Sequence, residues 1–132
     1  MSEEKIYFDH EKLKVYQNSL EFIVSIQDIL SKADFRSDIR NQFERASNSI
    51  VLNIAEGNGK YYPKDKCRYF DIAIGSSFEC SACLDILFSK KIISEIQLKT
   101  SKEQLKEIVA MLIGLIKSKS ERIYEANEEY EA

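Results

Sequence analysis

The chain has 132 residues, of which 44 % are hydrophobic and 31 % are charged, with three Cys, four Gly and one Pro. This composition excludes a disordered chain, and the odd number of cysteines argues against a secreted disulfide framework. The net charge of −3 excludes a uniformly polybasic nucleic-acid binder but permits a local basic patch. No basic-then-apolar leader is present, and no apolar run reaches the roughly 20 residues of a membrane span. We expect a cytoplasmic protein without a membrane partner, folded as one domain over residues 1–132.

The first predicted helix covers residues 10–32. Apolar residues recur at three- and four-residue steps along one line, formed by Leu13, Tyr16, Leu20, Ile23 and Leu30. A second line has seven-residue spacing and consists of Val15, Phe22 and Ile29. A helix with so wide an apolar surface contacts more than one neighbour, so either the bundle interior or a subunit interface covers it.

Three further helices are predicted. The second, over residues 37–56, starts at Ser37 as N-cap and ends at Gly57 in the left-handed conformation. The third, over 63–90, has Pro63 in its first turn. A capping box of Thr100 and Glu103 starts the fourth, over 101–124, and residues 125–132 form an acidic, frayed tail. Long helices with short connectors predict an all-α, up-down-up-down four-helix bundle.

A polar stripe runs along the second predicted helix. It recurs at three- and four-residue steps and consists of Gln42, Arg45, Ser49, Asn53 and Glu56. It is either a solvated face or a structural polar seam against the third helix. If the hairpin turns near residue 60, the partners of this seam are Arg68, Ser76 and Glu79. We then expect Arg45–Glu79 and Glu56–Arg68 contacts, with their burial left open.

These residues also carry a family resemblance. Residues 42–57, QFERASNSIVLNIAEG, resemble the pattern Q-x-x-R-A-x-x-S-I-x-x-N-I-A-E-G of the proteins encoded in intervening sequences of bacterial 23S ribosomal RNA genes. Residues 68–79, RYFDIAIGSSFE, are similar to that family's second block, R-[FY]-x-x-I-A-x-G-S-x-x-E, and LKVYQ at 13–17 matches its usual start. The resemblance spans about residues 11–120 and implies a four-helix bundle of the S23 type.

The resemblance extends to the accessory variability proteins of diversity-generating retroelements. Those proteins form five-fold rings and bind a reverse transcriptase and nucleic acid. They are strongly basic, whereas this chain has a net charge of −3. The resemblance therefore implies a homo-oligomer, with a pentameric ring favoured, and adds nucleic acid and protein as candidate partners.

Catalytic signals are nearly absent. The single histidine, His10, is interpreted as a surface or capping residue, so a histidine-based triad has little support. Cys80 and Cys83 form one C-x-x-C inside an apolar helix, without the second pair that a structural zinc site needs, and are interpreted as buried thiols. We expect no catalytic residue, no metal and no cofactor.

One end of the predicted bundle is basic, because the up-down-up-down order gathers the first helix start, the connector 57–66 and the fourth helix end. The candidate nucleic-acid-binding residues there are Lys14, Lys60, Tyr61, Tyr62, Lys64, Lys66, Arg68, Lys117, Lys119 and Arg122, with Lys12 nearby. Tyrosine rings offer stacking surfaces, and a helix N-terminus offers phosphate donors. The alternative is a solvated charged face, since Glu11, Asp65, Glu121 and Glu125 lie nearby.

The sequence thus supports a non-enzymatic oligomeric four-helix-bundle protein with two alternative roles. In the first, RNA or DNA binds at the basic end. In the second, the protein is a scaffold or protein-interaction module that uses its helical faces and binds no nucleic acid.

Overall fold

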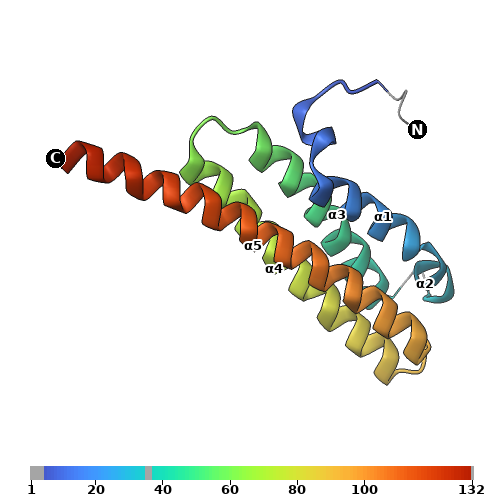
Figure 1. The fold of residues 1–132 in the computed structure, drawn as a ribbon. Coiled ribbons are helices and arrows are strands. Elements are labelled where there is room, and N and C mark those ends of the chain that lie inside the picture. The colour runs from blue at the N-terminus through green and yellow to red at the C-terminus, as the bar shows by residue number, and fades with distance from the viewer. Residues whose placement is uncertain (1–4, 35–36, 132) are drawn as a thin grey trace.

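The computed structural model describes residues 5–34 and 37–131, with side chains described as far as Lys119. Its elements are the 3-10 turn η1 (Asp9–Lys12) and the helices α1 (Lys14–Ser25), α2 (Gln27–Lys32), α3 (Asp38–Gly59), α4 (Pro63–Ser89) and α5 (Glu95–Glu131). In Figure 1, α3 packs on α4, α4 on α5, and α1 on both α3 and α5. Each helix therefore contacts its sequence neighbours, and the first contacts the last, which confirms the up-down-up-down four-helix bundle.

The first long helix is not continuous over residues 10–32, because it begins with η1 and is divided at Ile26 (φ −89°, ψ 0°). Side chains compete for the carbonyls of the last α1 turn. The Ser25 hydroxyl donates to the Phe22 carbonyl at 2.8 Å, and the Gln27 amide donates to the Ile23 carbonyl at 2.7 Å. Such local bonds bend helices. The bend leaves Ile26 and Ile29 buried in the core.

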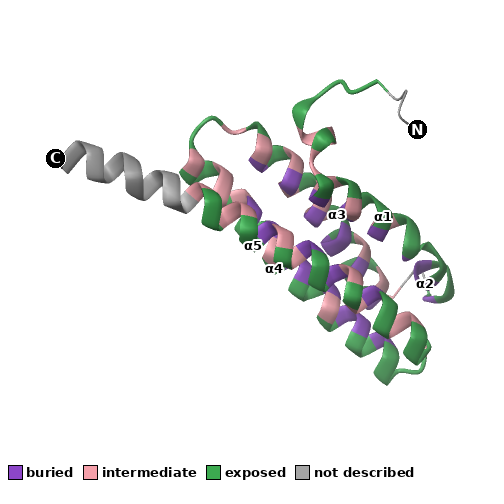
Figure 2. Ribbon diagram, viewed as in Figure 1, coloured by how far each residue is buried: buried purple, intermediate pink, exposed green. Residues whose placement is uncertain are grey.

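The core lies along the inward faces of all the helices, where the purple residues of Figure 2 lie. Phe22, Phe43 and Phe70 are its largest fully buried side chains. Phe22 and Phe43 pack edge to face, with ring centroids 6.4 Å apart, which joins α1 to α3. Burying each such ring contributes about 1.5–3 kcal/mol relative to leaving it exposed.

Helix α3 continues through Gly57 and ends at Gly59, so Gly57 is not a left-handed helix end. Gly57 is buried at a close contact between α3 and α4. A Cβ atom there would lie 2.9 Å from the Tyr69 Cβ and 3.0 Å from the Phe70 ring. The missing side chain is therefore what lets the hairpin close. Only residues 60–62 separate the two helices.

The register of this hairpin places Ser49 beside Ser76, with their hydroxyl oxygens 2.8 Å apart. The Asn53 amide donates to the Ser49 carbonyl at 2.8 Å and to its hydroxyl at 3.0 Å. A turn near residue 60 would have set Ser49 opposite residue 72. The observed pairing is offset from that expectation by four residues, which is about one helical turn. The polar seam is therefore short and uncharged.

The two predicted ion pairs of the seam do not form. Arg45 and Glu79 are both exposed, as are Gln42 and Arg68, and within the described side chains no salt bridge joins them. Glu56 instead lies 3.9 Å from Lys60, one turn further along α3. The prediction was wrong because Arg45, Glu79, Glu56 and Arg68 all lie on exposed faces of their helices, where water solvates their charges.

Helix α5 begins earlier than predicted, at Glu95. The Ser94 amide donates to the Gln97 side-chain oxygen at 2.9 Å, and the Gln97 amide donates to the Ser94 hydroxyl at 3.1 Å. This reciprocal pair is the capping box, and Thr100 and Glu103 lie inside the helix. At its other end α5 reaches Glu131, beyond the start of the predicted frayed tail.

Substituting Gly57 by Ala should destabilise the fold by about 1–3 kcal/mol, because the new methyl group overlaps Tyr69 and Phe70. Gly59→Ala is the matched control, since a Cβ there meets nothing within 4 Å. Ala is the better helix former, so the control should be neutral or up to about 1 kcal/mol more stable. Urea unfolding of both variants measures the difference, and equal stabilities would contradict the close approach.

Ser49→Ala and Ser76→Ala should each cost about 0.5–1.5 kcal/mol, and the double variant should cost less than their sum, because the two hydroxyls share one hydrogen bond.

Arg45→Ala and Glu79→Ala should stay within about 0.5 kcal/mol of the parent, as exposed side chains do. Thermal melts check both pairs. A large loss of stability in the Arg45→Ala variant would contradict this and would support a buried charged seam.

Candidate nucleic-acid interface

The basic end of the bundle forms where the α3–α4 connector meets η1 and the late turns of α5. The Asn58 amide donates to the Asp9 carboxylate at 3.1 Å, which ties α3 to η1. The Cys67 thiol lies 3.8 Å from the Ile116 carbonyl, which ties α4 to α5. The described residues of this basic end are Lys14, Lys60, Tyr61, Tyr62, Lys64, Lys66, Arg68, Lys117 and Lys119. Arg122, also predicted here, lies outside the described side chains.

Most cations of the basic end have no carboxylate partner. Lys60 lies 3.9 Å from Glu56, and the neighbouring Lys12 lies 3.9 Å from Asp9. Over the side chains described, the remaining cations make no ion pair, and these are Lys14, Lys64, Lys66, Arg68, Lys117 and Lys119. Unpaired cations at one end of a chain with net negative charge leave a local positive potential there.

The pKa of Lys66 reflects the positive charge gathered at this end. Burial lowers the pKa of its ammonium group from the ordinary value, and the nearby positive charge of Lys119 lowers it further, while Asp9 acts in the opposite direction. Its ammonium group donates to the Asn58 carbonyl at 2.5 Å, across the connector. Two cations from α4 and α5 are thus held close enough to repel each other. A bound anion would relieve that repulsion.

The acidic residues at this end are partly engaged by other groups. The Glu11 carboxylate accepts from the backbone amides of Tyr7 and Phe8, at 3.2 and 2.6 Å. Asp9 accepts from Asn58 and faces Lys12. Asp65 is exposed in the first turn of α4. Glu11 and Asp9 are therefore engaged by other donors, while Asp65 lies between Lys64 and Lys66 in the chain and forms no salt bridge with a described side chain.

Tyrosine rings lie among the cations. Tyr61 is 87 % exposed and Tyr62 is 64 % exposed, and their rings meet edge to face with centroids 5.1 Å apart. Behind them, the half-buried Tyr69 ring has the Lys60 ammonium at 5.0 Å and the Arg68 guanidinium at 5.8 Å. Tyr69 is not among the residues predicted for this site, although it directly follows Arg68 in the second family block.

His10 and the cysteines take structural positions. The His10 ring stacks on Phe8 with centroids 6.1 Å apart and meets Tyr16 edge to face at 4.7 Å. Cys80 and Cys83 are buried, and burial raises the pKa of both thiols, with neighbouring negative charge adding to the effect. Protonated, inaccessible thiols are poor nucleophiles and metal ligands. Over the residues described, no three His, Cys, Asp or Glu side chains gather as metal ligands.

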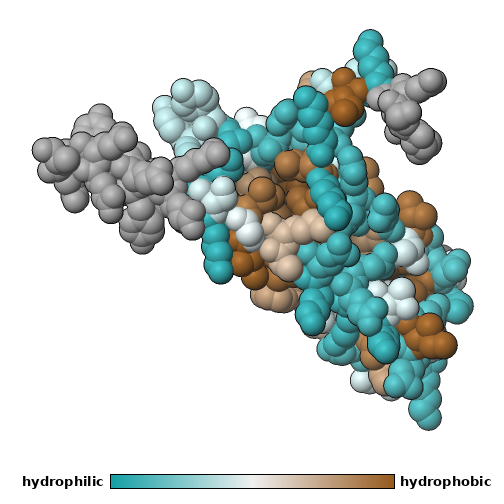
Figure 3. All heavy atoms as spheres, in the orientation of Figure 1, coloured by the Kyte–Doolittle hydropathy of each residue, from teal (hydrophilic) through white to brown (hydrophobic). Residues whose placement is uncertain are grey.

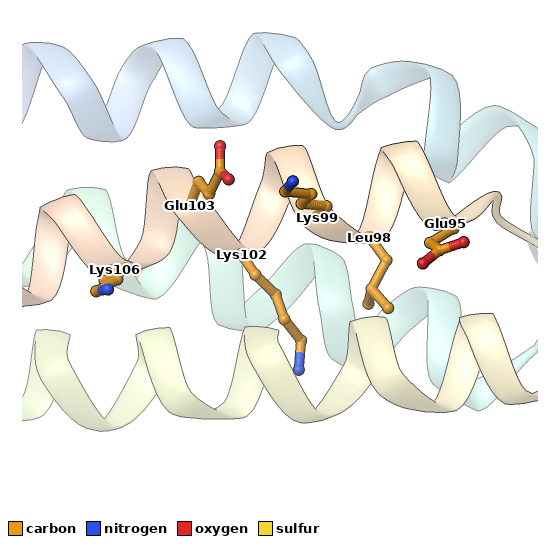
Figure 4. A pocket seen from close by; sticks show the side chains of 6 residues that line it. All are labelled: Glu95, Leu98, Lys99, Lys102, Glu103 and Lys106. Carbon is orange, nitrogen blue, oxygen red and sulfur yellow. The ribbon is translucent and has the colours of Figure 1, made fainter.

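Three surface hollows lined by described residues, at the starts of α3 and α5 and between α4 and α5, lie away from the basic end. One, of about 320 Å³, is lined by Glu95, Leu98, Lys99, Lys102, Glu103 and Lys106, all on α5. Figure 4 shows that Lys102 points from α5 toward α4, where it forms a 2.6 Å ion pair with Asp85. Glu103 points the other way in the same view. Polar groups that diverge in this way do not converge on a small-molecule ligand.

Comparison with known proteins gives the family. The model of the family described as 23S rRNA-intervening sequence protein matches residues 11–114. A crystal structure of a protein with unknown function from the S23 ribosomal protein family of Bacteroides thetaiotaomicron is similar over 78 % of this chain and 98 % of its own. The two share 26 % sequence identity and superpose with a TM-score of 0.73. No curated protein matches this chain.

These matches agree with the architecture built from the residues. Neither the family description nor the name of the solved relative states an enzymatic activity. The matched span begins just before α1 and ends within α5, so it includes the α3–α4 hairpin and the connector of the basic end. The chain belongs to the 23S rRNA-intervening sequence protein family.

Proposed function

We propose that this protein binds the phosphate backbone of a nucleic acid at its basic end and catalyses no reaction. The observation that carries the proposal is the set of cations there without carboxylate partners, among them Lys64, Lys66 and Lys117. Phosphate contacts from Lys and Arg supply most of the sequence-independent affinity for nucleic acid. The family description, which refers to intervening sequences of ribosomal RNA, favours RNA over DNA as the first ligand to test.

Like-charge repulsion supports the same ligand class. The pKa of Lys66 is lowered partly by Lys119, which means that the protonated pair raises the free energy of the unliganded protein. A phosphate bound beside the two ammonium groups would offset that repulsion, because it attracts both of them. The whole chain has a net charge of −3, so the remainder outside the basic end is acidic and would keep non-specific binding elsewhere low.

We also infer the cytoplasm as the compartment of the protein. All three cysteines are free thiols, and Cys80 and Cys83 lie one turn apart in α4 without a bond. Free thiols are typical of reducing compartments.

Charge reversal should locate the site. Replacing Lys14, Lys64 and Lys117 together by Glu should weaken binding to a labelled structured RNA by more than about tenfold and lower the slope of log K against log salt. The matched control replaces Lys32, Lys90 and Lys99, exposed lysines at the opposite end, by Glu. Both variants change the net charge equally, so only position differs between them.

Fluorescence anisotropy at two salt concentrations measures both variants beside the parent. Binding by the control but not by the basic-end variant supports the proposal. Equal losses in the two variants would indicate non-specific electrostatics. No binding by the parent at low salt would exclude nucleic acid as a ligand of the isolated protein.

A second candidate role, as a self-associating scaffold, is favoured by the outward face of α4. Phe78 is 61 % exposed, and Ile72 and Ile86 are each 42 % exposed. The three side chains spread over about 120° of the helix surface around Gly75, where a Cβ would meet nothing within 4 Å. Figure 3 shows apolar residues at the surface between polar ones on the face in view. Exposed apolar residues that form a contiguous patch are typical of protein interfaces.

By length and composition, α4 is apolar enough to cross a membrane. Within the bundle, 39 % of its most apolar stretch is buried. Its apolar character therefore needs one explanation for the buried part and another for the exposed part. The buried part packs against α3 and α5, as in the core of a bundle. For the exposed part, a second copy of the chain is the occupant we propose, in the pentameric ring that the sequence resemblance implies.

Phe78→Asp should dissociate such an assembly, because it places a charge in the apolar face. Leu52→Asp, at a 66 % exposed position on α3, is the control and should leave the assembly intact. Sedimentation velocity would report the mass of each variant. A parent chain that sediments as a monomer of 15.3 kDa would overturn the assembly.

A further inference from the structure

We propose that Tyr61 and Tyr62 stack on unpaired bases, so that the basic end prefers single-stranded nucleic acid to a duplex. The inference rests on the proposed function and names the class of nucleic acid that the site takes. It stands on the exposure of the two rings, the bracing of the connector that carries them and the cations around them.

The two rings have no role in the core. Tyr61 and Tyr62 are 87 % and 64 % exposed, and no hydrogen bond of either hydroxyl is found in the described structure. Each contacts the other edge to face, with an interplanar angle of 86°. This geometry leaves ring faces open to solvent, and an aromatic face is the surface on which a base stacks.

The connector that carries the rings is braced at both ends. The Lys60 amide donates to the Gly57 carbonyl at 3.2 Å, and the Lys66 amide donates to the Tyr62 carbonyl at 3.1 Å. The Lys66 ammonium spans the connector to the Asn58 carbonyl. Pro63 fixes the backbone immediately after Tyr62. A braced aromatic pair loses little conformational entropy when a ligand binds.

Cations flank the pair on both sides in sequence. Lys60 precedes Tyr61, and Lys64 follows Tyr62 by two residues, on the exposed first turn of α4. Phosphates alternate with bases along a strand, so a single strand whose bases stack on these rings would bring its phosphates near the lysines beside them. Two further exposed rings, Tyr7 and Phe8, precede η1. The hydrogen bond between Asn58 and Asp9 ties η1 to the end of α3.

The chemistry of the ligand sets the expected preference. Bases inside a duplex already stack on their neighbours, and their faces are closed to a protein ring. An unpaired base can leave its stack and lie on tyrosine. Phosphate contacts alone would favour a duplex, which has the higher charge density. A preference for the single strand would therefore come from the rings.

The test uses the full chain and three labelled oligonucleotides of equal length: a single strand, its duplex, and an abasic strand with the same phosphates. The parent should bind the single strand most tightly. Tyr61→Ala and Tyr62→Ala should each weaken single-strand binding about five- to tenfold and leave duplex and abasic binding unchanged. Phe88→Ala, an exposed ring at the far end of α4, is the control and should change nothing.

Tyr62→Trp supplies a second readout, because the chain has no tryptophan of its own. Its fluorescence should be quenched by the single strand and not by the abasic strand, while affinity is retained. Equal affinities for all three oligonucleotides, with unchanged binding by the alanine variants, would overturn the stacking inference and leave phosphate binding standing. No binding to any oligonucleotide by the parent would overturn both.

Discussion

The close approach of α3 and α4 at Gly57 is the constraint on which the rest of the structure depends. Because residue 57 has no side chain, the Tyr69 and Phe70 positions of α4 can lie directly against the α3 backbone. The hairpin then closes over three connecting residues. Its register places Ser49 on Ser76, so the buried polar contact between these helices is a neutral hydroxyl pair. A buried ion pair would have carried a desolvation cost of several kcal/mol per ion.

The packing of α3 on α4 decides what the hairpin presents to solvent. Arg45, Glu79 and Arg68 face outward, and Ile72 and Phe78 are exposed on α4. Tyr61 and Tyr62 are exposed on the connector. The hairpin thus generates two distinct surfaces, an apolar face along α4 and a basic, aromatic end. A nucleic-acid site and a self-association site could therefore operate together without overlapping.

Electrostatics at the basic end follow from topology more than from composition. A chain with a net charge of −3 gains a local excess of cations because the end of α3, the start of α4 and the late turns of α5 meet. The nearby carboxylates of Glu11 and Asp9 are engaged by backbone and side-chain donors of the N-terminal segment. The Lys66 pKa, lowered partly by Lys119, shows that charges far apart in sequence interact directly.

Sequence periodicity by itself determined the helical class, the number of long helices and their order, because the spacing of apolar residues encodes which face of each helix is buried. Ser37 as N-cap and Pro63 in the first turn of α4 could also be read locally, since each acts on its own backbone. The two family blocks identified the family because each is a continuous stretch of sequence. The gathering of Lys66 and Lys119 followed from helix order alone.

Only the tertiary structure decided the features that depend on packing between helices. Gly57 is a turn residue by local rules, but the neighbouring helix makes it a contact residue. The break at Ile26 and the capping box at Ser94 rest on local bonds, but the sequence offered competing choices, such as an equally plausible capping box at Thr100. The hairpin pairs Ser49 with Ser76, one turn away from the register expected, and the charged residues of the seam lie on exposed faces. Periodicity repeats every turn and cannot distinguish such registers, whereas steric closure at a single glycine can.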